Sequence, residues 1–116
     1  MEIKAADIIL CEFYFSDLKT SKSRPVLVFK DNLPFDDFVG IPISSQIEQL
    51  HADEILINST DFKLGILPKP SKLMLRKPFI VSKKVVIKKY GTLNSNAFNR
   101  YQQLFCNYFQ CCENRT

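Results

Sequence analysis

Residues Asp7-Ile-Ile-Leu-Cys-Glu-Phe-Tyr-Phe15 are the stretch from which the fold is most directly read. Apolar and aromatic residues that favour β-structure fill it almost completely, which predicts a strand with at least one buried face. The polar run Ser16-Asp-Leu-Lys-Thr-Ser-Lys-Ser23 follows and predicts an exposed loop. Arg24-Pro-Val-Leu-Val-Phe29 predicts a second strand, with Pro25 at its start, where a missing N–H disturbs strand pairing least.

Further short segments that favour β-structure recur along the chain. We expect strands at residues 38–43, 54–57, 73–76 and 88–93. Pro42 places the first of these at a sheet edge or at a strand end. Residues 64–70 predict a turn-rich connection, and residues 82–87 fit either a turn or a single helical turn. Several short strands without intervening helices favour a small barrel or sandwich over an α/β sheet.

The pattern changes after residue 93. Asn94 or Ser95 can cap a helix, because their side chains accept hydrogen bonds from the first free N–H groups. Apolar residues then follow at steps of three or four: Phe98, Tyr101, Phe105, Tyr108 and Cys112. This spacing predicts an amphipathic helix that packs on the barrel. Since no repeat or linker interrupts the chain, we expect a single domain over residues 1–116.

Composition limits the classes of protein that this chain can be. No apolar run reaches the ~18 residues that a membrane span needs, and residues 1–4 do not resemble a signal peptide, so we expect a cytoplasmic protein with no membrane partner. Three of the four cysteines lie near the end of the chain without a nearby histidine to complete a zinc site. We expect reduced thiols and no metal. His51, the single histidine, reads as a solvated loop residue.

Charge is distributed unevenly along the chain. Residues 1–58 contain five Lys or Arg against ten Asp or Glu, whereas residues 59–116 contain eleven against two. Nine basic residues and no acidic one lie between Lys63 and Lys89. A folded surface of one sign attracts polyanions, and it can equally bind an acidic protein partner.

Several segments resemble the MazF/PemK family of toxins over nearly the full length. Residues 6–10, Ala-Asp-Ile-Ile-Leu, are similar to the opening strand of the family, and residues 23–28, Ser-Arg-Pro-Val-Leu-Val, to its Arg-Pro strand. Residues 41–46, Ile-Pro-Ile-Ser-Ser-Gln, resemble its Pro-Ile-Thr-Ser-Gln. Residues 67–71, 77–79 and 89–93 resemble the later half of the PemK branch. The order and spacing of these segments support the resemblance more than any one of them does.

The resemblance implies a mainly β fold, a small SH3-like barrel of the CcdB/MazF type with a C-terminal helix, and a homodimer. It also implies a metal-independent endoribonuclease that cuts single-stranded RNA, needs no cofactor, and is silenced by a cognate antitoxin. Arg24 matches the key arginine of the family and Ser44 its threonine, so both are candidate catalytic residues. The candidate substrate-binding residues are Lys19, Lys22, Ser45, Gln46, Lys72 and Lys77.

The sequence departs from the family in two places. Ala6 replaces the usual glycine, which we expect the chain to tolerate if the backbone there does not need a positive φ. Met74 and Arg76 stand where the PemK branch has an Arg-x-Asp pair. The alternatives are a non-enzymatic toxin similar to the CcdB gyrase poisons, and an inactive SH3-like binding module.

Overall fold

The computed structural model describes residues 2–14 and 20–111. These described residues form eight strands and one helix, with short 3-10 turns between some of them. The elements are β1 (Asp7–Tyr14), β2 (Ser21–Leu33), β3 (Asp37–Ser44), β4 (Glu54–Ile57), β5 (Phe62–Gly65), β6 (Ser71–Met74), β7 (Phe79–Ser82), β8 (Val86–Leu93) and α1 (Ser95–Phe109). In the described part, no helix is long and apolar enough to cross a membrane.

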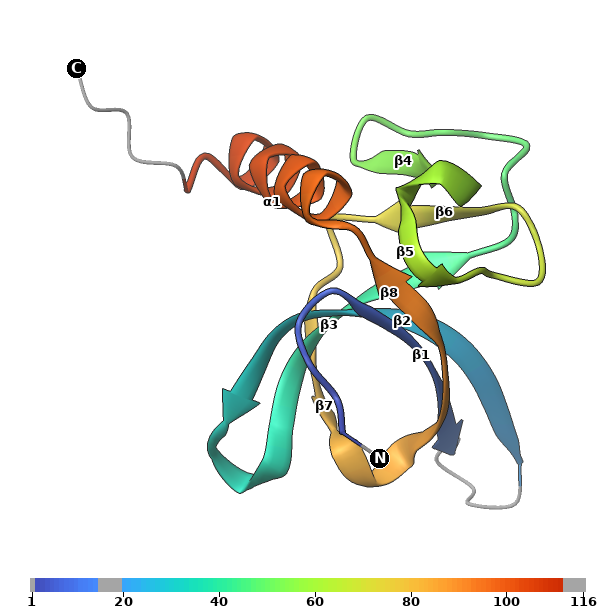
Figure 1. The fold of residues 1–116 in the computed structure, drawn as a ribbon, viewed down its shortest axis with the longest axis vertical. Helices are drawn as coiled ribbons and strands as arrows, with labels where there is room; N and C mark the ends of the chain where they lie inside the picture. The colour runs from blue at the N-terminus through green and yellow to red at the C-terminus, as the bar shows by residue number, and fades with distance from the viewer. Residues whose placement is uncertain (1, 15–19, 112–116) are drawn as a thin grey trace.

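The strands form one antiparallel sheet that curls into a half-barrel. Its order is β4-β6-β3-β2-β1-β8-β5, and β7 pairs with β3 beside β6. Figure 1 shows β1, β2, β3, β7 and β8 curving around one ring. The elements β4, β5, β6 and α1 lie together outside this ring, above it in the view. The predicted mainly β barrel with a C-terminal helix is confirmed.

The central strands are buried on both faces, which explains why residues 7–14 are apolar almost throughout. Ile8 and Leu27 belong to the larger core, together with the helix residue Tyr101. Their neighbours Ile9 and Val26 point the opposite way, into a second core inside the ring. Successive side chains of a strand alternate between faces, so two cores require apolar residues at consecutive positions.

Several strand predictions need adjustment. Pro25 lies inside β2 and not at its start, because β2 begins at Ser21. Pro42 lies inside β3. On the edge of β3 that pairs with β7 and β6 it falls in the gap between them, since β7 pairs as far as Gly40 and β6 begins to pair at Ile43. The predicted strand at residues 73–76 forms two residues earlier, as β6. The strands β5 and β7 were not predicted; residues 83–85 form the single helical turn that was one of the two expectations.

The helix α1 begins and packs as its sequence predicts. The Asn94 side chain accepts a hydrogen bond from the Ala97 N–H (2.8 Å), and Tyr101 is fully buried. Phe105 packs against Phe29 of β2, with ring centroids 4.6 Å apart. The predicted apolar face fades toward the end of the helix, where Tyr108 is 42% exposed. Cys112 lies outside the described residues.

A buried carboxylate fastens α1 to the sheet. Asp61 accepts hydrogen bonds from the Tyr101 hydroxyl and from the Arg100 guanidinium (3.1 Å). Burial opposes the charged form, but these hydrogen bonds and one from the Asn58 N–H outweigh it, so the pKa of Asp61 is lowered. The ionised carboxylate is therefore part of the folded structure near neutral pH.

The condition under which Ala6 would be tolerated is not met, because the backbone there has a positive φ. Its φ is 80°, a region that alanine rarely adopts. The surrounding sheet imposes this conformation, since the Ala6 N–H donates to the Val28 carbonyl and its own carbonyl accepts from the Leu93 N–H, both at 2.9 Å. The glycine of the family would fit this position without strain.

We therefore expect Ala6→Gly to stabilise the protein. The replacement removes a steric cost of roughly 1–2 kcal/mol and adds a smaller entropic cost, for a net gain of about 0.5–1 kcal/mol in the free energy of unfolding. Urea denaturation followed by circular dichroism measures this difference. Ala5→Gly is the matched control, because Ala5 has no positive φ and should gain nothing. An unchanged or lower midpoint for Ala6→Gly would show that Ala6 is not strained.

Candidate active site

A hollow of about 470 Å³ lies where the ends of several strands meet. Segments that are far apart in the sequence line it: the start of β2, the end of β3, the connection between β5 and β6, and β8. Its lining residues include Lys22, Ser23, Arg24, Pro25, Ser44, Ser45, Gln46, Leu67, Pro68, Lys69 and Tyr90. We call this site the cationic hollow.

Arg24 lies on the exposed part of β2, at the rim of the cationic hollow. It pairs with Cys11 of β1 through the backbone, and its side chain is exposed. Within the described residues, Arg24 forms no ion pair. Asp7, an acid on the neighbouring strand β1, binds Lys89 (3.1 Å) and the Thr92 hydroxyl (2.8 Å) instead of Arg24.

Ser44 ends β3 opposite Arg24. The register between β2 and β3 pairs Val26 with Pro42, and two residues further along it brings Arg24 opposite Ser44. The Ser44 Oγ accepts a hydrogen bond from the Gln46 N–H at 3.1 Å. Because this bond uses a lone pair of the oxygen, the hydroxyl proton remains able to donate to a ligand.

The charge of the cationic hollow suits a phosphate group. Lys22, Arg24 and Lys69 line it, and no acidic residue is among the described lining residues. The polar residues Ser44, Ser45 and Gln46 line the hollow beside these cations. A planar guanidinium can bind two phosphate oxygens at once, which a lysine cannot do.

The predicted site residues do not all meet at this place. Lys22, Ser45 and Gln46 line the cationic hollow together with Arg24 and Ser44. Lys77 is exposed in the turn after β6 but is not among the lining residues. Lys19 lies outside the described residues.

Lys72 does not fit its predicted role in binding RNA. Its ammonium group donates to Glu54 (2.8 Å) and to the Gln49 carbonyl (3.0 Å), and only 8% of its side chain is exposed. The pKa of Glu54 is lowered, first by a hydrogen bond from the His51 N–H and then by the one from Lys72. Lys72 is consequently a structural cation inside the protein, paired through the backbone with Ser44.

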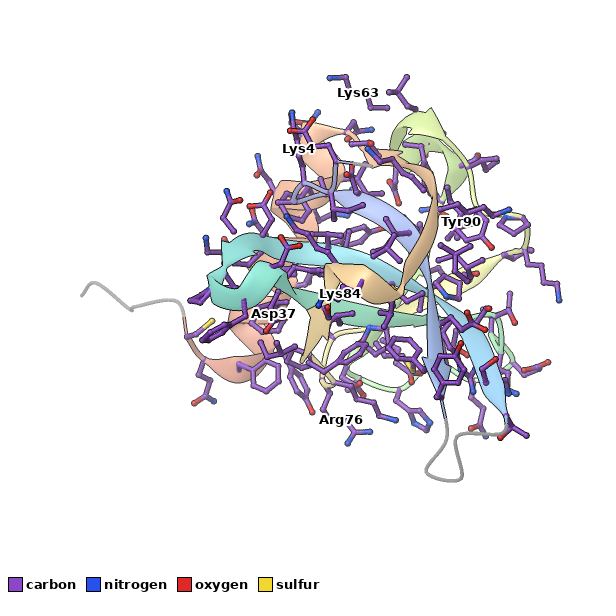
Figure 2. All side chains as sticks on the ribbon, turned by 90° about the horizontal axis from the view of Figure 1, so that it is seen from below. Lys4, Asp37, Lys63, Arg76, Lys84 and Tyr90 are labelled. Atoms are coloured by element: carbon purple, nitrogen blue, oxygen red, sulfur yellow. The ribbon has the colours of Figure 1, made fainter. Side chains whose placement is uncertain are left out.

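The basic run from Lys63 to Lys89 is not the unopposed surface that the sequence suggested. Acidic residues from elsewhere neutralise three of its members, since Lys72 pairs with Glu54, Arg76 with Asp53 and Lys89 with Asp7. Figure 2 also shows Lys63, Lys84 and Arg76 well apart from one another. The run is therefore spread around the molecule, and the cationic hollow receives only Lys69 from it.

Lys69 and Tyr90 are lining residues that the sequence did not single out. Both lie inside segments that resemble the later half of the PemK branch, but their spacing gives no sign that they face Arg24. The Lys88 ammonium lies 5.2 Å from the centre of the Tyr90 ring. His51 does not line the hollow, and it contributes its backbone N–H to Glu54.

The chain is thus a small half-barrel with a hollow at its strand ends, and the described lining of that hollow is cationic and contains no acid. The model of the family described as "PemK-like, MazF-like toxin of type II toxin-antitoxin system" matches residues 4–109, and the chain belongs to this family. The predicted family is thus confirmed over most of the chain. No curated protein matches the sequence.

Solved structures with the same fold include toxins and their complexes. An endoribonuclease from a mycobacterial species, solved with its cognate antitoxin, has a TM-score of 0.71 at 11% identity, with 97% of this chain and 100% of that chain covered. A chain in the structure of MazE–MazF from Deinococcus radiodurans has a TM-score of 0.73 at 10% identity (93% of this chain and 96% of that chain covered). The Mycobacterium tuberculosis toxin MazF-mt6 has a TM-score of 0.62 at 16% identity (88% and 96% covered). At these identities the likeness establishes the fold.

Proposed function

We propose that this toxin is a metal-independent endoribonuclease that cuts single-stranded RNA at the cationic hollow. The observation that supports the proposal most is the meeting of Arg24 and Ser44 with Lys22 and Lys69 in a hollow whose described lining contains no acid. Endoribonuclease is also the activity named for two of the similar structures. The family membership adds the setting of a type II toxin-antitoxin system.

The reaction can use a nucleophile that RNA itself supplies. The 2′-oxygen attacks the neighbouring phosphorus in line, a 2′-O–P bond forms, and the bond from phosphorus to the 5′-oxygen breaks. The 2′-hydroxyl gives up its proton and the leaving 5′-oxygen takes one, which yields a 2′,3′-cyclic phosphate and a 5′-hydroxyl. Arg24 stabilises the negative charge that grows on the phosphorane, and the Ser44 hydroxyl donates to one of its oxygens.

The cations around Arg24 hold the strand on which it acts. Lys22 and Lys69 bind the flanking phosphates, and Ser45 and Gln46 add neutral donors beside Ser44. Arginine is a poor proton carrier, because its pKa lies above ~12, so its role is electrostatic. Modest turnover is the expected consequence of a hollow with few groups for acid–base catalysis.

An RNA with methylated 2′-oxygens tests this chemistry. We expect the methylated strand to stay intact while the unmodified strand is cut, since methylation removes the nucleophile and leaves the phosphates in place. Gel electrophoresis, with mass spectrometry of the 3′ ends, measures both results in one assay. Cutting of the methylated strand, or a product without the cyclic phosphate, would refute the mechanism.

The family also supports inferences about the partner, oligomeric state, location and domain organisation of the protein. We infer that a cognate antitoxin covers the cationic hollow, because an unrestrained ribonuclease would harm the cell that makes it. We also infer a homodimer, a cytoplasmic location, and a single toxin domain over residues 1–116. The family match over residues 4–109 and the antitoxin in two of the similar structures support these inferences.

Charge reversal tests whether the exposed basic residues guide the antitoxin. Lys77→Glu should slow association with the cognate antitoxin several-fold at low salt and flatten its salt dependence, because long-range attraction raises association rates. The difference should vanish near 1 M salt, where the Debye length is ~3 Å. Stopped-flow fluorescence measures these rates. The control is Lys30→Glu, which changes an exposed residue of β2 outside the basic run. If Lys77→Glu and Lys30→Glu associate with the antitoxin at equal rates, Lys77 does not guide the antitoxin.

A further inference from the structure

A second hollow lies directly beside the cationic hollow. It has a volume of about 370 Å³, within the range of roughly 300–1,000 Å³ that small-molecule sites occupy. Its described lining residues are Phe13, Arg24, Val26, Pro42, Ile43, Ser44, Met74 and Phe79. We call it the apolar hollow. Arg24, Ile43 and Ser44 line both hollows, so a ligand bound to Arg24 reaches either one.

The lining of the apolar hollow is aromatic and aliphatic. The rings of Phe13 and Phe79 come from β1 and β7, and their centroids lie 5.8 Å apart with the planes inclined by 50°. Met74, at the end of β6, takes the position where the PemK branch has an arginine. The polar side chains among the described lining residues are those of Arg24 and Ser44.

The position of this hollow identifies the kind of group that fits it. In a strand, alternate residues share a face, so Arg24 points to the same side of β2 as Val26, which lines the apolar hollow. A nucleotide whose phosphate binds Arg24 carries a flat aromatic base close to that phosphate. Single-stranded RNA is bound by stacking such bases on aromatic side chains beside a cationic groove.

We propose that the apolar hollow seats the base of a nucleotide that flanks the cut phosphate. The proposal rests on the proposed ribonuclease function and adds a base-binding site to it. Phe13 and Phe79 provide the aromatic surface, and Met74 closes the hollow with a flexible apolar side chain. An arginine at position 74 would place a charge there, so the departure from the family creates this seat.

The lining of the apolar hollow also determines how it selects among the bases. The described side chains offer no hydrogen-bonding group for a base edge apart from Arg24 and Ser44, which the phosphate occupies. The base is therefore selected by its stacking area, and purines are preferred over pyrimidines because they stack on more surface. Ile80 offers a neighbouring control, because it is a large apolar residue that follows Phe79 on the same strand but is 60% exposed and does not line the hollow.

Cleavage of an RNA library with random sequence tests the proposal. We expect sequencing of the product ends to show that the wild type prefers a purine at one of the two positions flanking the cut. Phe79→Ala should lower the rate of cutting about tenfold, as loss of one stacking partner does, and should reduce the preference for a purine. Met74→Phe should narrow the hollow and shift the same position toward pyrimidines. Ile80→Ala should retain the wild-type pattern.

The outcomes separate this proposal from the one on which it rests. If the wild type cuts the library but both hollow variants keep its preference at each flanking position, the apolar hollow is not a base site, although the ribonuclease function stands. If the wild type leaves the library intact, the ribonuclease function itself fails. Thermal unfolding of each variant shows whether it is folded. If Phe79→Ala does not fold, Met74→Phe still tests the proposal.

Discussion

Arg24→Ala should abolish RNA cleavage and growth inhibition while the protein stays folded. Loss of a group that stabilises developing charge lowers the rate by about 10²–10³-fold, and little activity should remain where few other catalytic groups exist. The side chain is exposed and forms no ion pair within the described residues, so its removal leaves no buried charge behind. The thermal midpoint should therefore shift by no more than a degree or two.

The control for this variant is Lys30→Ala, which removes an exposed cation from the same strand outside the cationic hollow. It should cut RNA at the rate of the wild type. Ser44→Ala should lower the rate less than Arg24→Ala does, since it removes a neutral donor. If Arg24→Ala unfolds the protein together with its activity, Arg24 is a structural residue.

Lys72→Met should destabilise the protein by about 3 kcal/mol, the second large effect that we expect. Removal of one partner from a buried ion pair leaves the other charge without compensation. Here the remaining charge is Glu54, whose side chain is 7% exposed. Because Lys72 pairs with Ser44 through the backbone, cleavage should weaken as well. Urea denaturation at pH 7 measures the first effect.

The pH dependence and a double variant identify the cause. The pKa of Glu54 lies below its ordinary value of 4.5, so its charged form stabilises the wild type above that pH and the contribution is lost as the pH falls. The difference between wild type and Lys72→Met should accordingly shrink below about pH 4.5. Adding Glu54→Gln should recover part of the stability. A constant difference between pH 7 and pH 3 would exclude the ion pair as the cause.

Much of the fold could be predicted because its signals are local. The apolar run at residues 7–14 gave β1, and the Asn94 cap with the spacing of Phe98, Tyr101 and Phe105 gave α1. The strand β7 was missed because it is defined by pairing with β3, a contact distant in the sequence. The interior place of Pro42 depends on a gap between β6 and β7, which the sequence does not encode locally.

The candidate site was predictable where the resemblance supplied the residues, and less so where the fold decides their surroundings. Arg24 and Ser44 come together because the register of β2 and β3 aligns them. Lys69 and Tyr90 join them through connections that no local pattern reveals. Lys72 was misread because its charge suggested a surface, whereas the cross-strand acid Glu54 allows it to be buried.

Incubation of the purified protein with a long unstructured RNA in EDTA tests the central claim most directly. We predict that the wild type cuts the RNA into fragments that end in 2′,3′-cyclic phosphate, and that Arg24→Ala leaves it whole. Intact RNA after incubation with folded wild type would contradict the claim, and it would favour a toxin that acts by binding protein or an inactive binding module.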